Sequence, residues 1–255
     1  MNEIAVKIQD GENGFVCFYP NMDLRSAVCR LVIPYLPPEQ VEEHMDDFLS
    51  VGLTADEVAE VLWSWQIKNN IPKLLASGVK PQDIIEKLGH DEERLEKYFD
   101  LLLDYGASIN EILIRIGDDS MWYRNINIED LLAKGADPNI IARYAIDGRY
   151  YDSSVLMKTL LEHGADCNCI IATVLNRRQG YLLIDNYRLL SKYGKFDLET
   201  LIYEGHIDYK DVLMNLEELS LFGIKINAKK FAKMVARRKG CKYSYILAEC
   251  GLNRR

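Results

Sequence analysis

A glycine recurs at nearly constant spacing along almost the whole chain, and this regularity constrains the fold more than any other feature. The repeat glycines are Gly52, Gly78, Gly106, Gly135, Gly164, Gly194, Gly223 and Gly251, so the interval is always 26 to 30 residues. Most of them end a leucine-containing phrase such as "DLLLDYG" or "EDLLAKG". A fixed period of about 20 to 50 residues is typical of an array of stacked repeats.

Each period carries the pattern of two helices. Glycine adopts without steric cost the left-handed conformation that commonly ends a helix, so each repeat glycine is predicted to end one. Apolar residues then follow six, seven and ten positions later, for example Ile84, Ile85 and Leu88 after Gly78. This spacing places them on one face of the next helix. Because one such pair of helices cannot bury its apolar face alone, the pattern predicts a stack.

Polar residues after the glycines are expected to start the first helix of each repeat. Ser108 with Glu111, and Thr54 with Glu57, have the spacing of a capping box. The side chains of three asparagines 29 residues apart are expected to lie in turns or caps and not to bind ligands; these are Asn110, Asn139 and Asn168.

Two phrases resemble the junction between consecutive ankyrin repeats: "LLAKGADPN" at 131–139 and "LLEHGADCN" at 160–168. More degenerate copies extend the resemblance over about residues 22–251. The resemblance implies stacked helix–loop–helix repeats. The period near 29 is shorter than the ankyrin period of about 33, and the Thr-Pro-Leu-His start of the ankyrin helix is missing. We therefore expect shortened or absent β-fingers, and a binding mode built from those fingers does not carry over.

The N-terminus departs from the repeat. "EIAVKI", "QDGENG" and "FVCFYP" predict strand, turn and strand, with Asp-Gly and Asn-Gly as hairpin signals. An isolated hairpin is marginal in water, so we expect it to cap the first repeat. The predicted fold is all-α: an ankyrin-like α-solenoid of seven to eight repeats over 22–255, forming a single elongated domain, with a β-hairpin cap over 1–21.

No pattern in the sequence supports catalysis. The histidines are His44, His90, His163 and His206, and no metalloprotease, nucleotide-binding or nucleophile-elbow motif accompanies them. Cys167 and Cys169 have no second Cys or His pair at zinc-site spacing. We expect a non-enzyme that needs no metal or organic cofactor. Six scattered cysteines, no apolar run that could span a bilayer and no signal-peptide pattern favour a cytoplasmic protein with reduced thiols.

The loops between the first and second helices are rich in arginine and aromatic residues, which are enriched at interface hot spots. We predict that they form a partner-binding rim, or flank one. The predicted residues are Trp122, Tyr123, Arg124, Arg149, Tyr150, Tyr151, Arg177, Arg178, Tyr181, Arg237 and Arg238. The alternative is that the tyrosines open the second helices and pack between repeats. The favoured function is a non-catalytic protein–protein interaction scaffold, an adaptor, effector or inhibitor that occludes a partner protein.

Charge is distributed unevenly, and this leaves a second function open. The chain carries a net charge of −8, yet residues 225–255 contain ten basic residues and a single acid, Glu249. The basic C-terminal end and the aromatic rim could bind nucleic acid through phosphate contacts and stacking. Residues 39–60 hold eight acids and no Lys or Arg, so an acidic surface that imitates nucleic acid is a third possibility.

Overall fold

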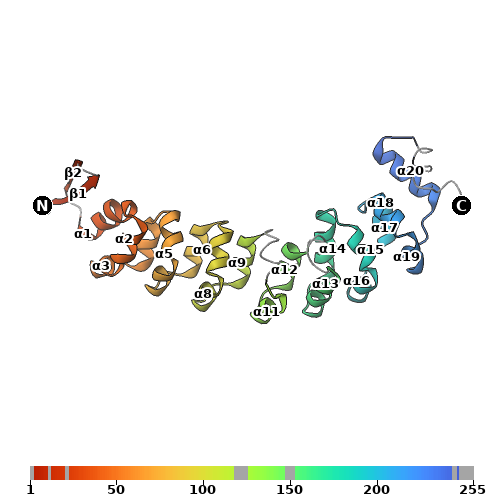
Figure 1. Cartoon of the computed structure of the whole chain (residues 1–255), viewed down its shortest axis with the longest axis horizontal. Helices are drawn as coiled ribbons and strands as arrows, with labels where there is room; N and C mark the ends of the chain where they lie inside the picture. The colour runs from red at the N-terminus through yellow and green to blue at the C-terminus, as the bar shows by residue number, and fades with distance from the viewer. Residues whose placement is uncertain are drawn as a thin grey trace. The chain divides into compact units, whose positions relative to one another are not determined.

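Helices make up nearly all of the regular structure, which confirms the expected all-α class (Figure 1). The computed structural model describes residues 3–10, 13–20, 23–117, 126–146, 153–242 and 246, with side chains from residue 23 onward. The chain divides into two compact units, Met1–Gly117 and Asp118–Arg255. One helical domain over 22–255 remains a prediction.

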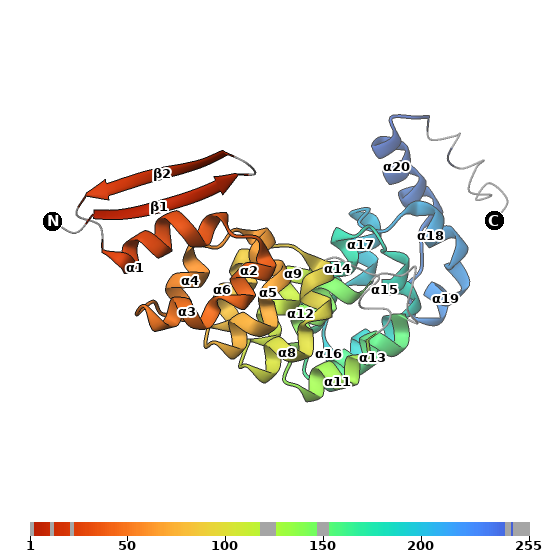
Figure 2. The same ribbon diagram turned by 60° about the vertical axis from the view of Figure 1, so that its left-hand side comes forward.

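Unit 1 begins with an antiparallel pair of strands. β1 (Glu3–Asp10) pairs with β2 (Asn13–Pro20) so that Glu3 lies opposite Pro20 and Asp10 opposite Asn13. β1 contacts the first helix, α1 (Leu24–Ala27), and Figure 2 shows the two strands beside it. Whether the hairpin caps a repeat array remains a prediction.

The remaining elements of unit 1 are helical. After a π-helical turn at Val28–Val32 and a 3-10 turn at Ile33–Tyr35, they are α2 (Pro38–Glu43), α3 (Met45–Ser50), α4 (Ala55–Val61), α5 (Ser64–Ala76), α6 (Pro81–Leu88), α7 (Glu92–Lys97), α8 (Phe99–Asp104) and α9 (Ile109–Ile116).

Unit 2 continues the same helix-and-turn pattern. Its described helices are α11 (Ile128–Ala133), α12 (Pro138–Ala145), α13 (Ser153–Glu162), α14 (Cys167–Asn176), α15 (Tyr181–Asp185), α16 (Tyr187–Tyr193), α17 (Leu198–Tyr203), α18 (Tyr209–Met214), α19 (Leu216–Leu221) and α20 (Ala228–Lys239).

Six of the repeat glycines end a helix in the predicted way. Their φ angles are positive, from 81° at Gly223 to 97° at Gly78. The residue after each glycine donates its N–H to a carbonyl five positions back, as from Val79 to Leu74 at 3.0 Å and from Ala165 to Leu160 at 2.9 Å. This is the Schellman arrangement, which satisfies the carbonyls that a helix end leaves open. The left-handed turn is confirmed at these six positions.

Gly194 departs from this rule, and the prediction of a left-handed turn there was wrong. Its backbone is extended, with φ −152° and ψ 164°. A Cβ at this position would lie 2.8 Å from both Cβ and Sγ of Cys167. The absence of a side chain at Gly194 therefore lets the end of α16 approach the start of α14. Gly251 lies outside the described residues.

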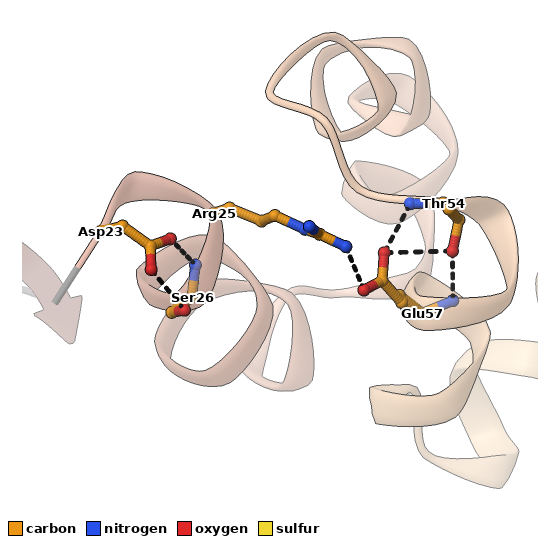
Figure 3. Close-up of polar contacts among 5 residues, drawn as sticks. All are labelled: Asp23, Arg25, Ser26, Thr54 and Glu57. Carbon is orange, nitrogen blue, oxygen red and sulfur yellow. Dashed lines mark hydrogen bonds and ion pairs between the residues drawn. The ribbon is translucent and has the colours of Figure 1, made fainter.

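The restart of each first helix follows the sequence only in part. Thr54 and Glu57 form the predicted capping box: the Thr54 hydroxyl accepts the Glu57 N–H at 3.2 Å, and the Glu57 carboxylate accepts the Thr54 N–H at 2.8 Å (Figure 3). The box predicted at Ser108 does not form, because the N–H of Glu111 donates to the Ser108 carbonyl instead, at 3.1 Å.

The asparagines of the GADxN phrases are not the caps themselves. Asp137 and Asp166 are the N-cap residues, and their carboxylates accept the backbone N–H of Asn139 and Asn168, each at 2.8 Å. The Asn139 side chain instead accepts the N–H of Asp166 at 2.7 Å. Asn139 therefore hydrogen-bonds one repeat to the next.

Several second helices are bent eight residues before the repeat glycine, which the sequence analysis did not predict. The bends lie at His44, Tyr98, Asn186 and Asn215, with φ between −98° and −110°. Backbone hydrogen bonds continue across them, for example from Leu102 to Tyr98 at 2.8 Å. At the equivalent position of unbroken α5, the amide of buried Asn70 donates to the Pro38 carbonyl at 2.9 Å.

The core forms where the first helices meet their neighbours. The residue six positions after the glycine has no exposed surface in five repeats; these are Val58, Ile84, Ile112, Ile141 and Ile170. Consecutive first helices touch in both units, α4 with α6 and α12 with α14. The repeated apolar position is therefore part of the core on which neighbouring first helices pack.

Candidate partner-binding surface

Open hollows lie between consecutive first helices. In unit 1 the hollow between α4 and α6 has a volume of about 620 Å³ and is lined by Asp56, Glu57, Ala59, Glu60, Lys80, Asp83, Glu86 and Lys87. In unit 2 the hollow between α12 and α14 has a volume of about 680 Å³ and is lined by Arg143, Tyr144, Cys169, Ala172, Thr173, Asn176 and Arg177. A smaller hollow of about 190 Å³ lies beside α20.

The repeat pattern explains which side chains reach the hollows. In the four helices that line the two larger hollows, the residue eight positions after the glycine is Glu60, Glu86, Arg143 or Ala172, and each is exposed. It follows directly after two buried apolar residues at positions six and seven. Since successive helix residues are turned by about 100°, position eight points away from the core. In these four helices the position can therefore vary without disturbing the packing.

The α4–α6 hollow is predominantly acidic. Lys80 pairs with Asp56 at 3.3 Å, and Lys87 donates to the Glu60 carbonyl oxygen at 2.8 Å. The Thr54 N–H, the Thr54 hydroxyl and the Arg25 guanidinium together hold the pKa of Glu57 below its usual value. Figure 3 shows this carboxylate between Arg25 and Thr54. Glu57 therefore stays ionised into acidic solution.

The α12–α14 hollow has the opposite character. None of the described residues that line it is a carboxylate, whereas two are arginines. Arg143 is exposed, and Arg177 donates to the carbonyls of Arg143 at 3.0 Å and Tyr144 at 3.3 Å. These carbonyls lie at the C-terminal end of α12, where cationic groups are favoured. Arg177 is thus held in place at the edge of the hollow.

The described residues of the predicted rim lie in several different settings. Arg177 lines the α12–α14 hollow, and Arg238 lines the hollow beside α20, where it donates to the Gly205 carbonyl at 2.8 Å. Arg178 is exposed and has a positive φ of 57°. Tyr181 is half-buried at the start of α15, and Arg237 is exposed on α20.

The other predicted rim residues lie outside the described residues: Trp122, Tyr123, Arg124, Arg149, Tyr150 and Tyr151. The binding role of the whole set therefore remains a prediction. Sequence reasoning also passed over two exposed tryptophans. Trp63 and Trp65, at the start of α5, are 60% and 48% exposed. The phrase "WSW" at 63–65 was the available signal, because tryptophan is usually mostly buried.

Within the part of the chain that the structure describes, no three His, Cys, Asp or Glu side chains are grouped so that they could hold a metal ion. Burial, reinforced by the Asp166 carboxylate, raises the pKa of the Cys167 thiol, which keeps it protonated at neutral pH. None of the described helices has the length and apolar character needed to cross a bilayer.

No protein-family model, curated protein or solved structure matches this chain.

Proposed function

We propose that this chain is a non-catalytic protein-binding scaffold built from ankyrin-like repeats, which acts as an adaptor, effector or inhibitor by covering a surface of a partner protein. The observation that carries the proposal is the recurrence of open hollows between first helices, at equivalent repeat positions, with different side chains in each. A shared core with variable exposed positions suits recognition, because each repeat can match a different part of a partner.

The α12–α14 hollow is the strongest candidate contact. It combines Tyr144, Arg143 and Arg177 around the small side chain of Ala172. Arginine and tyrosine supply both apolar area and polar groups, which is why they dominate interface hot spots. Arg177 is already fixed by its bonds to two carbonyls, so ordering it on binding costs little entropy. A partner side chain that fills the hollow would also bury apolar surface, worth about 25 cal/mol per Å².

Filling the hollow tests the proposal. Ala172 is exposed on α14, so Ala172→Arg should leave the fold intact while occupying the space. The matched control is Val155→Arg, at a site 59% exposed on the second helix α13. Affinity capture is carried out from nuclease-treated lysate of the native host, and bound proteins are quantified by mass spectrometry.

The expected result is a protein retained by the wild type and by Val155→Arg but reduced about tenfold or more with Ala172→Arg, as for loss of a hot spot. Equal retention by both variants would remove this hollow as the contact. A partner lost on nuclease treatment of the wild type would contradict protein binding.

A further inference from the structure

Helix α20 and the residues on either side of it present a strongly cationic surface. The stretch 225–242 contains no Asp or Glu, and all of its basic residues are exposed; these are Lys225, Lys229, Lys230, Lys233, Arg237, Arg238, Lys239 and Lys242. Within a chain of net charge −8, this is a strong local excess of positive charge. Such a surface raises the local concentration of anionic ligands.

Some of these cations already contact other parts of unit 2, to which α20 belongs. The Lys230 ammonium lies 4.1 Å from the centroid of the Tyr203 ring, and the Lys239 ammonium lies 3.8 Å from that of Tyr209. Arg238 donates to a backbone carbonyl. Within the described residues, the side chains of the other five make no ion pair or hydrogen bond; these are Lys225, Lys229, Lys233, Arg237 and Lys242. Their charge is therefore available to a ligand.

Three of the available cations form a row. Lys229, Lys233 and Arg237 follow one another at intervals of four residues along α20. With a rise of 1.5 Å per residue, four residues advance about 6 Å along the axis and about one turn around it, so the three side chains lie on one side of the helix. A row of this kind suits a ligand with regularly repeated negative charges.

The packing of α20 selects among anionic ligands. Its apolar face is already buried in unit 2 through Phe231, Ala232, Val235 and Ala236. A helix that binds a membrane surface inserts an exposed apolar face, whereas the apolar face of α20 is already buried. The cores of protein interfaces are depleted in lysine and need aromatic or arginine anchors, whereas the exposed row consists mostly of lysine. A phosphate group can be bound by cationic side chains alone, without an apolar face or an aromatic anchor.

We infer that α20 binds the phosphate backbone of nucleic acid, through the row Lys229, Lys233 and Arg237 flanked by Lys225 and Lys242. This activity goes beyond the protein binding proposed above and does not depend on it. Contacts between lysine and phosphate carry no sequence information, so binding is independent of base sequence. It is also strongly salt-dependent, because each phosphate contact releases counterions.

Fluorescence anisotropy of the full chain with a labelled mixed-sequence DNA duplex tests the inference. If five phosphates are contacted, the affinity should fall ~500-fold between about 50 and about 200 mM salt, with a slope of about −4.5 in the double-logarithmic plot. Failure of the wild type to bind the duplex at low salt would overturn the inference. So would binding to phosphatidylserine vesicles, or to polyglutamate, without binding to the duplex.

Neutralising the row gives the sharper test. Lys229→Gln/Lys233→Gln/Arg237→Gln should make the salt slope shallower by about 2.7 and lower the affinity at low salt at least tenfold. The matched control is Lys192→Gln/Lys195→Gln/Lys210→Gln, which removes the same charge from exposed positions elsewhere in unit 2 and should keep the wild-type slope. Equal losses in both variants would show an effect of total charge and overturn the assignment to α20.

A single substitution guards against any effect of the triple variant on folding. Arg237→Gln alone should reduce the slope by about 0.9, in proportion to the loss of one phosphate contact. The circular dichroism of both α20 variants should match that of the wild type, since the replaced side chains are exposed. An unchanged slope for Arg237→Gln in a folded protein would remove this residue from the site.

Discussion

Units 1 and 2 have the same kind of buried core but carry opposite charges in equivalent hollows. Ile84 in unit 1 and Ile170 in unit 2 occupy the same repeat position and have no exposed surface. Two positions later, the helices that line the hollows carry exposed Glu60 and Glu86 in unit 1, and exposed Arg143 and Ala172 in unit 2. In the helices that line the hollows, packing holds position six to apolar residues, while position eight is exposed and free to change. The comparison teaches that these repeats separate the residues that build the stack from those that give each hollow its chemistry.

The two units also differ in regularity. In unit 1, all the repeat glycines have positive φ and follow the same hydrogen-bond pattern. In unit 2, Gly194 is extended against Cys167, and Arg178 takes a positive φ that would suit glycine better. Unit 2 therefore depends on contacts specific to single repeats, where unit 1 follows the general pattern.

The largest expected effect tests whether the cores are equivalent. Ile84→Ala and Ile170→Ala each remove a fully buried side chain and leave a cavity, so each should lower the free energy of unfolding by about 2–4 kcal/mol. Urea denaturation measures both. Glu86→Ala, at an exposed position, should change it by less than about 0.5 kcal/mol. A cost below about 1 kcal/mol for only one of the isoleucines would break the comparison.

The next effect separates the regular glycines from Gly194. At Gly78, a Cβ would meet no described atom within 4 Å, so Gly78→Ala costs only the backbone strain of φ 97°, about 1 kcal/mol. Gly194→Ala carries no such strain but forces a contact of 2.8 Å with Cys167, so it should cost about 1–3 kcal/mol.

A double-mutant cycle distinguishes the two causes. Cys167→Ala removes Sγ, one of the two atoms that the new Cβ at Gly194 would meet. It should therefore reduce the cost of Gly194→Ala and leave that of Gly78→Ala unchanged. Additive costs for the Gly194 and Cys167 substitutions would show that their contact does not explain the glycine.

The features that recur along the chain could be predicted from the sequence, whereas those that occur once could not. The glycine turns and the buried isoleucines occur in several repeats, so their positions can be compared within one sequence. A side chain at position 194 is excluded by Cys167, 27 residues earlier, and no local pattern marks that contact. The bend at Asn186 was also not predicted. The i to i−4 hydrogen bonds continue across it, and the spacing of apolar residues along the sequence is nearly that of a straight helix.

The candidate site was predictable in residue type but not in arrangement. The arginines were expected to contact a partner. In the structure, Arg177 and Arg238 instead donate hydrogen bonds to backbone carbonyls of this chain that are more than 30 residues away in sequence. Hot-spot composition cannot reveal such bonds. The charge of each hollow, by contrast, was readable at position eight, because Glu60, Glu86 and Arg143 follow directly after two apolar residues in the repeat.

A smaller effect tests the irregularity of unit 2 at Arg178. Its φ of 57° is unfavourable for any residue with a Cβ, whereas Gly89 and Gly117 carry positive φ after first helices of unit 1. Arg178→Gly should therefore raise the free energy of unfolding by about 1 kcal/mol, after allowing for the greater freedom of glycine in the unfolded chain. Arg178→Ala keeps the backbone strain and should stay within about 0.5 kcal/mol of the wild type. A Gly variant no more stable than the Ala variant would show that the strain is absent.

The smallest effect compares one surface carboxylate from each unit across pH. Hydrogen bonds from Thr54, with Arg25, hold the pKa of Glu57 below its usual value of about 4.5. Hydrogen bonds from Thr200 hold the pKa of Asp197 below about 3.8. A carboxyl group with a lowered folded-state pKa stabilises the fold above its unfolded pKa, and this is lost as the pH falls through the folded value. Glu57→Gln and Asp197→Asn should therefore be destabilising at pH 7, and both differences from the wild type should shrink towards pH 3.

Added salt should weaken only the Glu57 effect, because Arg25 supplies an ion pair that can be screened, whereas Thr200 supplies only hydrogen bonds. Thermal denaturation at several pH values and two salt concentrations measures this, and a difference that grows on acidification would contradict the assigned pKa directions.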